Sequence, residues 1–319
     1  MLTMITKIIR EIESNSSFLV TTHEGPDGDA VGSTMALACY LRALGKDVTL
    51  YYCDPIPDTY HFLPLSKHAV HTIPDRMFDV CFLLDAGELK RAGTELSAFN
   101  GYGKLINIDH HPYCEEFGDL NYVDSSASAT GALIYRILKA AGYALDYDTA
   151  LCVYVAIVAD TGSFRYSNAD PEAFQVAGEL VALGINPWSV AEKLYESQPL
   201  KRLELLALAL STLTVSKSGE FASITVTLDM YKKTGSTSEL TDGFVNYPRS
   251  IHGVEVSIFF REIKEGVYKV SFRSKGKVNV SSLAMAFGGG GHHNAAGCTL
   301  LGSLDEVRET VFSYLDLAV

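Results

Sequence analysis

The sequence predicts an α/β protein, with a first domain built on a parallel sheet that carries helices on both faces and a smaller second α/β domain. Three observations lead to this class. Short β-prone apolar runs alternate with apolar stretches of helical spacing through the first half of the chain. The run Phe78–Asp85 is apolar almost throughout, as expected of a strand that a parallel sheet buries on both faces. From about Thr212 onward the pattern changes to alternating strands.

The elements follow one another in a regular order. We expect a helix over 1–13, strands over 18–21, 47–52, 78–85, 104–109 and 120–124, and helices over 33–44, 128–141, 149–158 and 171–183. The pairs Asn186-Pro187 and Gln198-Pro199 bracket a segment expected to connect two domains. Beyond it we expect strands over 223–228, 254–262 and 268–273 and helices over 281–287 and 304–315. The predicted domains are therefore 1–186 and 212–319, joined by a linker region over 187–211.

The composition is that of a globular protein large enough for two domains. The chain has 319 residues, of which 47% are hydrophobic and 20% charged. No apolar run approaches the roughly 20 residues that a membrane span needs, and residues 1–13 have the pattern of a capped amphipathic helix instead of a signal peptide. The six cysteines are scattered without CxxC pairs, which is typical of buried thiols in a reducing compartment. We therefore expect a cytoplasmic protein with no membrane segment.

The formal net charge of −12 limits the kind of nucleic acid that the protein can bind. Long duplex DNA requires a broad basic surface, so it is not expected as a partner. A small phosphate ligand held by metal ions and a few arginines is compatible with an acidic chain. The charge therefore restricts the size of the substrate more than its type.

The stretch 22–33 places a histidine and two aspartates on a tight turn between a strand and a helix. It reads THEGPDGDAVGS, and the three side chains are His23, Asp27 and Asp29. Three such groups within seven residues, held by Gly and Pro, would repel one another or stay solvated without a counter-ion, and a divalent metal supplies one. The alternative is a simple helix start, with Asp29 as the cap, Asp27 in a turn and His23 incidental.

Further polar side chains follow the ends of later elements. Asp85 ends an apolar strand, the triplet Asp109-His110-His111 ends the next one, and Asp160 follows an apolar helix. Ligands of an α/β sheet gather at the carboxyl ends of its strands, so these groups are expected to meet. Carboxylates with imidazoles suit a pair of Mn²⁺-like ions better than zinc thiolate chemistry. A shared carboxylate such as Asp85 would bridge two ions about 3.5–4 Å apart, with a hydroxide between them for in-line attack on phosphorus. The alternatives are an ordinary strand-end turn for the triplet and an ordinary helix-terminal residue for Asp160.

At these residues the chain resembles the DHH phosphoesterase superfamily, which is named for the triplet seen here at 109–111, and the resemblance covers essentially the whole length. It implies one metal ion held by His23, Asp27 and Asp85, and another held by Asp29, Asp85, His110 and Asp160. It implies that Asp109 orients its neighbours and that His111 contacts the scissile phosphate or protonates the leaving oxygen. The expected cofactor is two Mn²⁺ ions, with Mg²⁺ or Co²⁺ as substitutes.

The stretch Gly288–Gly297 is similar to the glycine-rich signature of the DHHA1 substrate domain. Consecutive glycines let backbone N–H groups approach an anion closely, and the histidines at 292 and 293 offer a further donor. Arg273 offers a two-pronged contact to phosphate. The expected substrate-binding residues are Arg273, Gly289, Gly290, Gly291 and His292, together with Arg249 and Arg165. For Arg249 and for Arg165, the alternative is an arginine that is simply solvated.

A two-domain chain of this kind resembles the nanoRNase/pAp phosphatase group. The resemblance implies a metal-dependent phosphodiesterase and exoribonuclease that degrades very short oligoribonucleotides and linear dinucleotides to mononucleotides. It also implies a 3′(2′),5′-bisphosphate nucleotidase activity that converts 3′-phosphoadenosine 5′-phosphate (pAp) to AMP, and it suggests a homodimer.

Two other functions compete with this one. The first is a cyclic-dinucleotide phosphodiesterase acting on cyclic di-AMP, and the second is a catalytically idle nucleotide-binding regulator on the same fold. A regulator has no need of a complete set of metal ligands, so the full set predicted here argues against it. The order of preference among pApA, pGpG, pAp and cyclic di-AMP stays open at this point.

Overall fold

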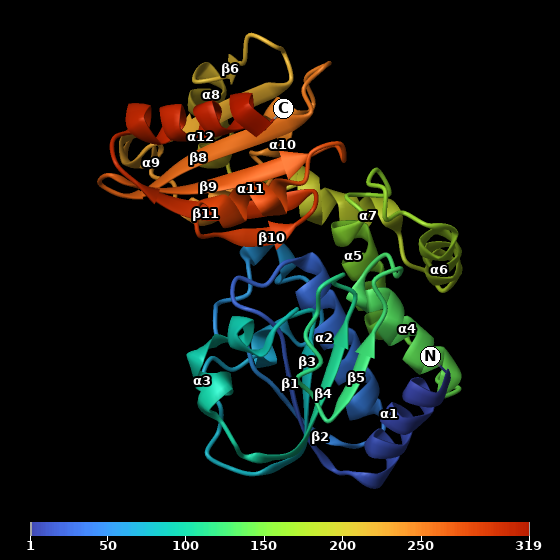
Figure 1. Ribbon diagram of the computed structural model, residues 1–319. Coiled ribbons are helices and arrows are strands. Elements are labelled where there is room, and N and C mark those ends of the chain that lie inside the picture. The colour runs from blue at the N-terminus through green and yellow to red at the C-terminus, as the bar shows by residue number, and fades with distance from the viewer. Residues whose placement is uncertain (1, 319) are drawn as a thin grey trace. The chain divides into compact units, whose positions relative to one another are not determined.

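The computed structural model describes residues 2–318, apart from the side chains of residues 2, 292 and 316–318. The chain divides into two compact units, Met1–Ser197 and Gln198–Val319. Each unit has its own sheet and its own hydrophobic core, so the predicted α/β class is confirmed (Figure 1). None of the helices in the described part combines the length and apolar character that a membrane crossing requires.

The first unit is built on a sheet of five strands that all run parallel, in the order β2-β1-β3-β4-β5. Its strands are β1 (Ser17–Thr21), β2 (Asp47–Leu50), β3 (Phe78–Leu84), β4 (Tyr102–Asp109) and β5 (Leu120–Val123). Its helices are α1 (Leu2–Ser14), α2 (Gly28–Ala43), α3 (Gly93–Ala98), α4 (Thr130–Ala140), α5 (Tyr147–Asp160), α6 (Pro171–Ala182) and α7 (Pro187–Ala191), with short turns at Asp58–Tyr60, Ser66–His68, Leu89–Ala92 and Glu192–Glu196.

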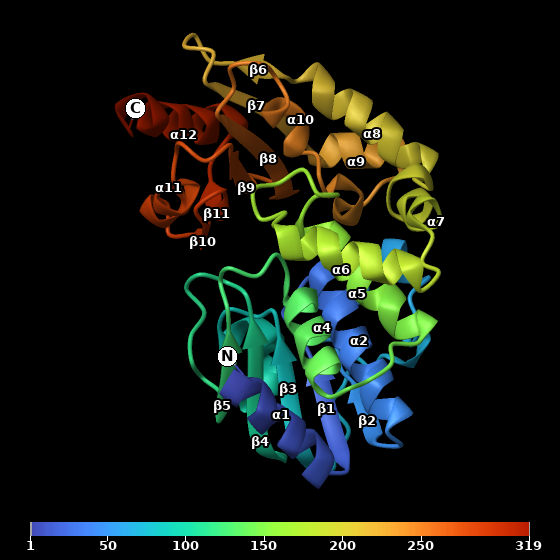
Figure 2. The ribbon, with the colours of Figure 1, turned by 90° about the vertical axis from the view of Figure 1, so that its right-hand side faces the viewer.

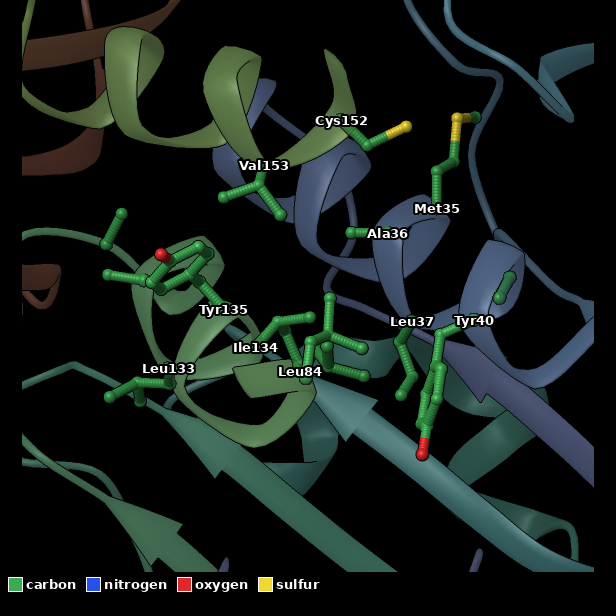
Figure 3. Packing of buried hydrophobic residues seen from close by; sticks show 14 of the residues in the cluster. Met35, Ala36, Leu37, Tyr40, Leu84, Leu133, Ile134, Tyr135, Cys152 and Val153 are labelled. Carbon is green, nitrogen blue, oxygen red and sulfur yellow. The ribbon is translucent and has the colours of Figure 1, made fainter. Parts of the chain in front are cut away.

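Both faces of this sheet are buried, as the apolar strands predict. Along β3, Val80, Phe82 and Leu84 pack with α1, α2, α4 and α5 in one cluster, while the alternate residues Cys81 and Leu83 pack against the α3 side in another. Figure 1 shows α3 on the opposite side of the sheet from α1 and α4. Figure 3 shows the first cluster, where side chains from α2, α4 and α5 meet above Leu84.

Helix α2 begins five residues earlier than the apolar spacing predicts, at Gly28 instead of Ser33. The reason is its close contact with α5. A Cβ at Gly32 would lie 2.6 Å from the carbonyl oxygen of Cys152, and a Cβ at Gly28 would overlap Ala159. The glycines that weaken the helical pattern in the sequence are therefore the residues that let the two helices approach each other.

The strand order has a reversal point between β1 and β3, because the chain moves from β1 outward to β2 and then returns to the other side of β1. In open α/β sheets, a crevice forms at the carboxyl ends of the strands at such a point. Residues that follow β1 and β3 are therefore placed beside each other at this edge of the sheet.

In the described part of the second unit, six strands form a mixed sheet in the order β10-β11-β9-β8-β7-β6. The pair β7 and β8 is parallel and the other pairs are antiparallel. Its strands are β6 (Thr214–Val215), β7 (Phe221–Val226), β8 (Val256–Lys264), β9 (Val267–Ser274), β10 (Gly290–His292) and β11 (Ala295–Leu301). Its helices are α8 (Leu200–Ser211), α9 (Leu228–Thr234), α10 (Asn246–Arg249), α11 (Val280–Ala286) and α12 (Leu304–Ala318), with a turn at Ser238–Thr241. Helices α11 and α12 pack on one face and α8 on the other (Figure 2).

The predicted linker region is largely helical. Residues 187–211 contain α7, a π-helical turn at Glu192–Glu196 and α8, and the division between the two compact units falls inside this region. Both prolines that suggested a connector stand at helix starts: Pro187 lies in the first turn of α7, where the Asn186 side chain caps the helix, and Pro199 directly precedes α8. The predicted domain bounds stay a proposal.

Candidate metal centre

The predicted metal ligands lie together at the carboxyl edge of the first sheet. His23 follows β1, Asp85 follows β3 and His110 follows β4, while α2 begins beside them and α5 ends beside them. Among the residues that the structure describes, three groups have donor atoms within 4.8 Å of one another. They are His23, Asp27 and Asp85; Asp29, His110 and Asp160; and Asp85, His110 and His111.

The start of α2 positions the two aspartates of the turn differently. Asp27 is the cap of the helix, since its Oδ1 accepts the backbone N–H groups of Asp29 and Ala30, both at 3.0 Å. Asp29, expected as the cap in the alternative reading, is buried in the first turn instead and accepts the N–H groups of Thr130 at 2.6 Å and Gly131 at 2.9 Å. Capping and metal binding by Asp27 are compatible, because Oδ2 takes no part in the cap.

Asp85 occupies the centre of the cluster. Its Oδ2 lies 3.8 Å from Nε2 of His23, and its Oδ1 lies 3.6 Å from Nε2 of His110 and 3.5 Å from Nδ1 of His111. Its backbone has a φ of +60°, which is uncommon outside glycine and departs from the extended conformation of β3. One carboxylate oxygen therefore faces the His23 group and the other faces the His110 group, which is the arrangement that a ligand shared between two ions requires.

His110 is oriented from behind by the backbone. Its Nδ1 lies 3.2 Å from the carbonyl oxygen of Ala127, so this nitrogen carries the proton in the neutral ring. Its Nε2 points at three carboxylates, 3.7 Å from Asp29, 3.6 Å from Asp85 and 3.7 Å from Asp160. A metal-binding histidine typically has this arrangement, with one nitrogen tied to a carbonyl and the other directed at the ion.

Asp109 and His111 form a hydrogen-bonded pair beside Asp85. Asp109 is fully buried and accepts hydrogen bonds from the backbone N–H of Gly87 at 2.6 Å and from the backbone N–H and Nδ1 of His111 at 2.7 and 2.6 Å. Burial alone would raise the pKa of Asp109, but these hydrogen bonds from His111 and Gly87 lower it to about 2. Asp109 therefore stays ionised and holds the ring of His111 through Nδ1.

The buried carboxylates of the cluster lie so close together that positive charge between them is favourable. Burial raises the pKa of Asp29, Asp85 and Asp160, and repulsion between neighbouring carboxylates adds to the rise. Burial alone would lower the pKa of His110, but the charges of Asp85 and Asp160 outweigh this effect and raise it. The pKa of His23 is lowered by burial. Several carboxylates crowded in a water-poor site are stable together only when protons or cations compensate them. The donor set of oxygens and imidazole nitrogens fits divalent ions such as Mn²⁺.

Sequence reasoning missed four residues that surround the cluster. Thr130 and Gly131 hold Asp29, Asn168 donates its Nδ2 to Asp160 Oδ2 at 2.8 Å, and Arg91 brings a positive charge near His23. Thr130, Gly131 and Arg91 lie far along the chain from the residues they approach, so no local spacing reveals them. Asn168 lies only eight residues after Asp160, in the loop after α5.

Apart from Arg249, the predicted substrate residues of the second unit lie in β9, in the edge strand β10 or directly before it. Arg273 in β9 pairs with Ala295 in β11, and Ala295 pairs with His292 in β10, so the backbones of these three positions form one row across the sheet. The side chain of His292 lies outside the described part of the structure. Arg273 is half-buried, and its Nη1 donates to the carbonyl oxygen of Phe272 at 3.0 Å.

The glycine run has a packing role beside the one predicted for it. A Cβ at Gly289 would overlap the carbonyl oxygen of Gly297, and a Cβ at Gly291 would lie 2.5 Å from that of Ala295. The missing side chains of these two glycines therefore allow β11 to lie close to the backbone of residues 289–291. Gly290 is exposed with open space beside it, which keeps it available to a ligand.

The two remaining predicted arginines lie in different units. Arg165 is exposed in the loop after α5, where its Nε donates to the carbonyl oxygen of Gly162 at 2.6 Å. Arg249 is half-buried in the last turn of α10. Their role in substrate binding stays a prediction.

Comparison with known proteins agrees with this architecture. Residues 17–157 match the model of the DHH family, N-terminal domain, and residues 223–316 match that of the DHHA1 domain. The chain is 34% identical to the bifunctional oligoribonuclease and PAP phosphatase NrnA of Thermus thermophilus, over 97% of this chain and 91% of that protein. It is 30% identical to the NrnA of Bacillus subtilis, over 93% of both chains.

A solved structure extends the similarity to three dimensions. An exopolyphosphatase-related protein from Bacteroides fragilis superposes with a TM-score of 0.90 at 31% identity, covering 98% of this chain and 95% of that one. Sequence similarity and fold thus agree over nearly the whole length of the chain. Together with the cluster of histidines and aspartates at the carboxyl edge of the parallel sheet, they place the chain in the DHH/DHHA1 phosphoesterase family.

Proposed function

We propose that this protein is a divalent-metal-dependent phosphoesterase that hydrolyses very short oligoribonucleotides to mononucleotides and pAp to AMP. The observation that carries the proposal is the position of Asp85, whose two carboxylate oxygens face two different groups of donors. The substrate class is supported by the names of the two NrnA relatives, at 34% and 30% identity over nearly the full chain. The homodimer and the cytoplasmic location stay predictions.

The residues divide into two proposed ion sites. Site one consists of His23, Asp27 and Asp85, and site two consists of Asp29, Asp85, His110 and Asp160. When bound, divalent cations supply Lewis acidity at the phosphoryl oxygens and make water a nucleophile at neutral pH. Mn²⁺ suits this mixture of carboxylate and imidazole donors, and Mg²⁺ or Co²⁺ are substitutes.

His111 is proposed as the proton donor to the leaving oxygen. The carboxylate of Asp109 accepts a hydrogen bond from Nδ1 of His111 and so fixes the orientation of the ring. Nε2 is then the nitrogen that gives its proton to the departing alkoxide. Asp109 therefore sets both the orientation of the ring and the atom from which the proton leaves.

Recognition of the nucleotide is assigned to polar groups outside the ion sites. The proposed substrate contacts of the second unit are Arg249, Arg273, Gly289, Gly290, Gly291 and His292. The first unit contributes Arg165. Backbone N–H groups and guanidinium groups bind phosphate without a broad basic surface, which fits a chain with a net charge of −12.

The test is reconstitution of the purified protein. Chelated protein should be inactive and should regain activity with Mn²⁺, but not with Ca²⁺, which is a poor Lewis acid. Products from pApA, pGpG, pAp and cyclic di-AMP are separated by chromatography. Full activity after exhaustive chelation would contradict the metal mechanism. Cleavage of cyclic di-AMP alone would establish the cyclic-dinucleotide activity instead, and binding without any product would establish the idle regulator.

A further inference from the structure

The segment 127–131, which leads from β5 into α4, touches the ligands of site two. Thr130 donates its backbone N–H to Asp29 at 2.6 Å and its hydroxyl to Oδ1 of Asp85 at 2.9 Å, and Gly131 donates its N–H to Asp29 at 2.9 Å. The carbonyl oxygen of Ala127 lies 3.2 Å from Nδ1 of His110. Three of the four ligands of site two are thus held directly by five consecutive residues.

The fourth ligand is tied to the same segment through Asn168. The side-chain amide of Asn168 donates to Oδ2 of Asp160 at 2.8 Å and to the carbonyl oxygen of Ser128 at 2.9 Å. It also reaches the carbonyl oxygen of Asp160 at 3.2 Å. Asn168 therefore links the end of α5 to the segment that precedes α4.

The contact of Thr130 distinguishes the two ion sites. Its hydroxyl bonds to Oδ1 of Asp85, the oxygen that faces His110, and not to Oδ2, which faces His23. The segment is itself fixed, because Thr130 is fully buried and Gly131 packs so tightly on α5 that a Cβ would overlap Ala156. The hydroxyl of Thr130 therefore holds the oxygen of Asp85 that is directed at the ligands of site two.

We infer that Thr130 and Asn168 are positioning residues that set the cation affinity of site two and leave that of site one largely unchanged. The inference rests on the proposed function, because it takes Asp29, Asp85, His110 and Asp160 as ion ligands. Neither residue needs to touch the ion. Each one holds a ligand in the orientation that binding demands, and loss of such a partner typically weakens metal affinity about 10–100-fold.

The experiment counts Mn²⁺ ions bound to the full chain at increasing free Mn²⁺, by equilibrium dialysis. Two reference variants assign the binding steps: Asp160→Asn removes a ligand of site two, and His23→Ala removes a ligand of site one. Thr130→Val keeps the shape and the backbone N–H but removes the hydroxyl. Thr130→Ser keeps the hydroxyl, and Asn168→Ala removes the amide. The matched control is Thr149→Val, since Thr149 is also fully buried in the first turn of a helix, at the opposite end of α5 from Asp160.

We expect Thr130→Val and Asn168→Ala to weaken the step assigned to site two by about 10–100-fold, with the other step changed less than about threefold. Thr130→Ser should restore most of the affinity, and Thr149→Val should match the wild type. Raising Mn²⁺ should return kcat in Thr130→Val but not in Asp160→Asn. If Thr130→Val does not fold, Asn168→Ala carries the same test from a loop position.

The two possible failures are distinguishable. A wild-type protein that shows no Mn²⁺-dependent hydrolysis contradicts the proposed function. The positioning role alone is overturned by a different result. In that case the wild-type protein is active and binds two ions, but Thr130→Val and Asn168→Ala leave both Mn²⁺-binding steps unchanged or weaken them equally.

Discussion

Asp85 combines a strained backbone with a central position among the predicted ligands. A left-handed conformation costs an L-residue roughly 1–2 kcal/mol, and aspartate is one of the few residue types that adopt it outside glycine. The carboxylate of this residue lies between His23 and His110. Strain of this kind persists where the surrounding structure enforces it, which in enzymes is often at the active site.

Replacing Asp85 tests the residue at the centre of the proposed site. Asp85→Asn keeps the shape but removes the charge that would hold two cations together, so turnover of all substrates should fall by several orders of magnitude. The fold should survive, because the change removes a buried negative charge from a crowded cluster. Turnover of pAp and pApA with Mn²⁺ checks the first effect, and circular dichroism with urea unfolding checks the second. A folded variant that keeps more than about a tenth of wild-type activity would contradict the bridging role of Asp85.

At the scale of elements, the contact between α2 and α5 sets the geometry of the site. Asp27 caps α2, Asp29 lies in its first turn, and α5 ends with Asp160, so the spacing of these helices decides how close the carboxylates come. Gly32 meets Cys152 and Ala156 at this contact. The sequence shows small residues at these positions but not that they face each other.

Gly32→Ala tests this close approach. The added methyl group would lie 2.6 Å from the carbonyl oxygen of Cys152 and 2.9 Å from Ala156, so the helices must separate. We expect a loss of about 1–3 kcal/mol in the free energy of unfolding, together with weaker Mn²⁺ binding. Urea unfolding measures the loss, with Gly178→Ala in α6 as the control, because a Cβ at Gly178 meets open space. If Gly32→Ala were as stable as the control, α2 and α5 could accommodate the added methyl group, and the expected role of their close approach would be wrong.

Helix α4, which carries Thr130, is anchored at its middle by Arg136. The Nη1 of Arg136 donates to Oδ2 of Asp124 at 2.6 Å, and its Nε and Nη2 donate to Glu172 in the first turn of α6. The same helix has the Lys139–Glu179 ion pair near its end. These contacts fix the helix between the end of β5 and α6.

Asp124→Asn should show the pH dependence of this anchor. Burial alone would raise the pKa of Asp124, but hydrogen bonds from Ser126 and Arg136 lower it. A carboxyl group with a lowered folded-state pKa stabilises the fold above its unfolded pKa, about 3.9, and loses that contribution as the pH falls through the folded value. The variant should therefore be about 1–3 kcal/mol less stable than the wild type near neutral pH.

That difference should shrink below about pH 4, where the wild-type carboxylate takes up its proton. Urea unfolding of both proteins between pH 3 and pH 7 measures it, with Asp229→Asn as an exposed control on α9. A difference that stays constant over the whole range would show that the ionised form of Asp124 contributes nothing.

At the scale of the whole molecule, the two units are proposed to have different tasks. The first unit holds all the predicted ion ligands and His111, and so has the groups needed to break a phosphodiester. The second unit holds Arg273 and the glycine run and none of the predicted ion ligands. We propose that it binds the part of the substrate away from the scissile bond.

Arg273→Ala separates these tasks. Loss of a guanidinium that binds a phosphate should reduce kcat/KM for pApA and pAp, by roughly 2–4 kcal/mol in transition-state terms. Hydrolysis of a small activated aryl phosphodiester, which has no second nucleotide or phosphate to be bound, should barely change. The comparison is kcat/KM for both substrates in both proteins. Equal losses on the two substrates would mean that Arg273 serves the fold or the ion sites, and the division of tasks would be wrong.

Several features of this protein were determined by its sequence alone. Alternation of strands and helices predicted a parallel sheet, and a parallel sheet brings the carboxyl ends of its strands to one edge. His23, Asp85 and the triplet at 109–111 each follow a strand, so their meeting could be predicted without knowing any distance. That they bind metal ions stays a prediction, which the measurements above address.

Only the tertiary structure decided how these residues are held. Thr130 and Asp29 are 101 residues apart, and Asn168 and Ser128 are 40 apart, so no local spacing could reveal their hydrogen bonds. The start of α2, hidden by Gly28 and Gly32, depends on contact with α5 in the same way. Periodicity and capping reflect neighbours within a few residues along the chain, whereas the orientation of a buried carboxylate depends on whichever donor the folded chain brings beside it.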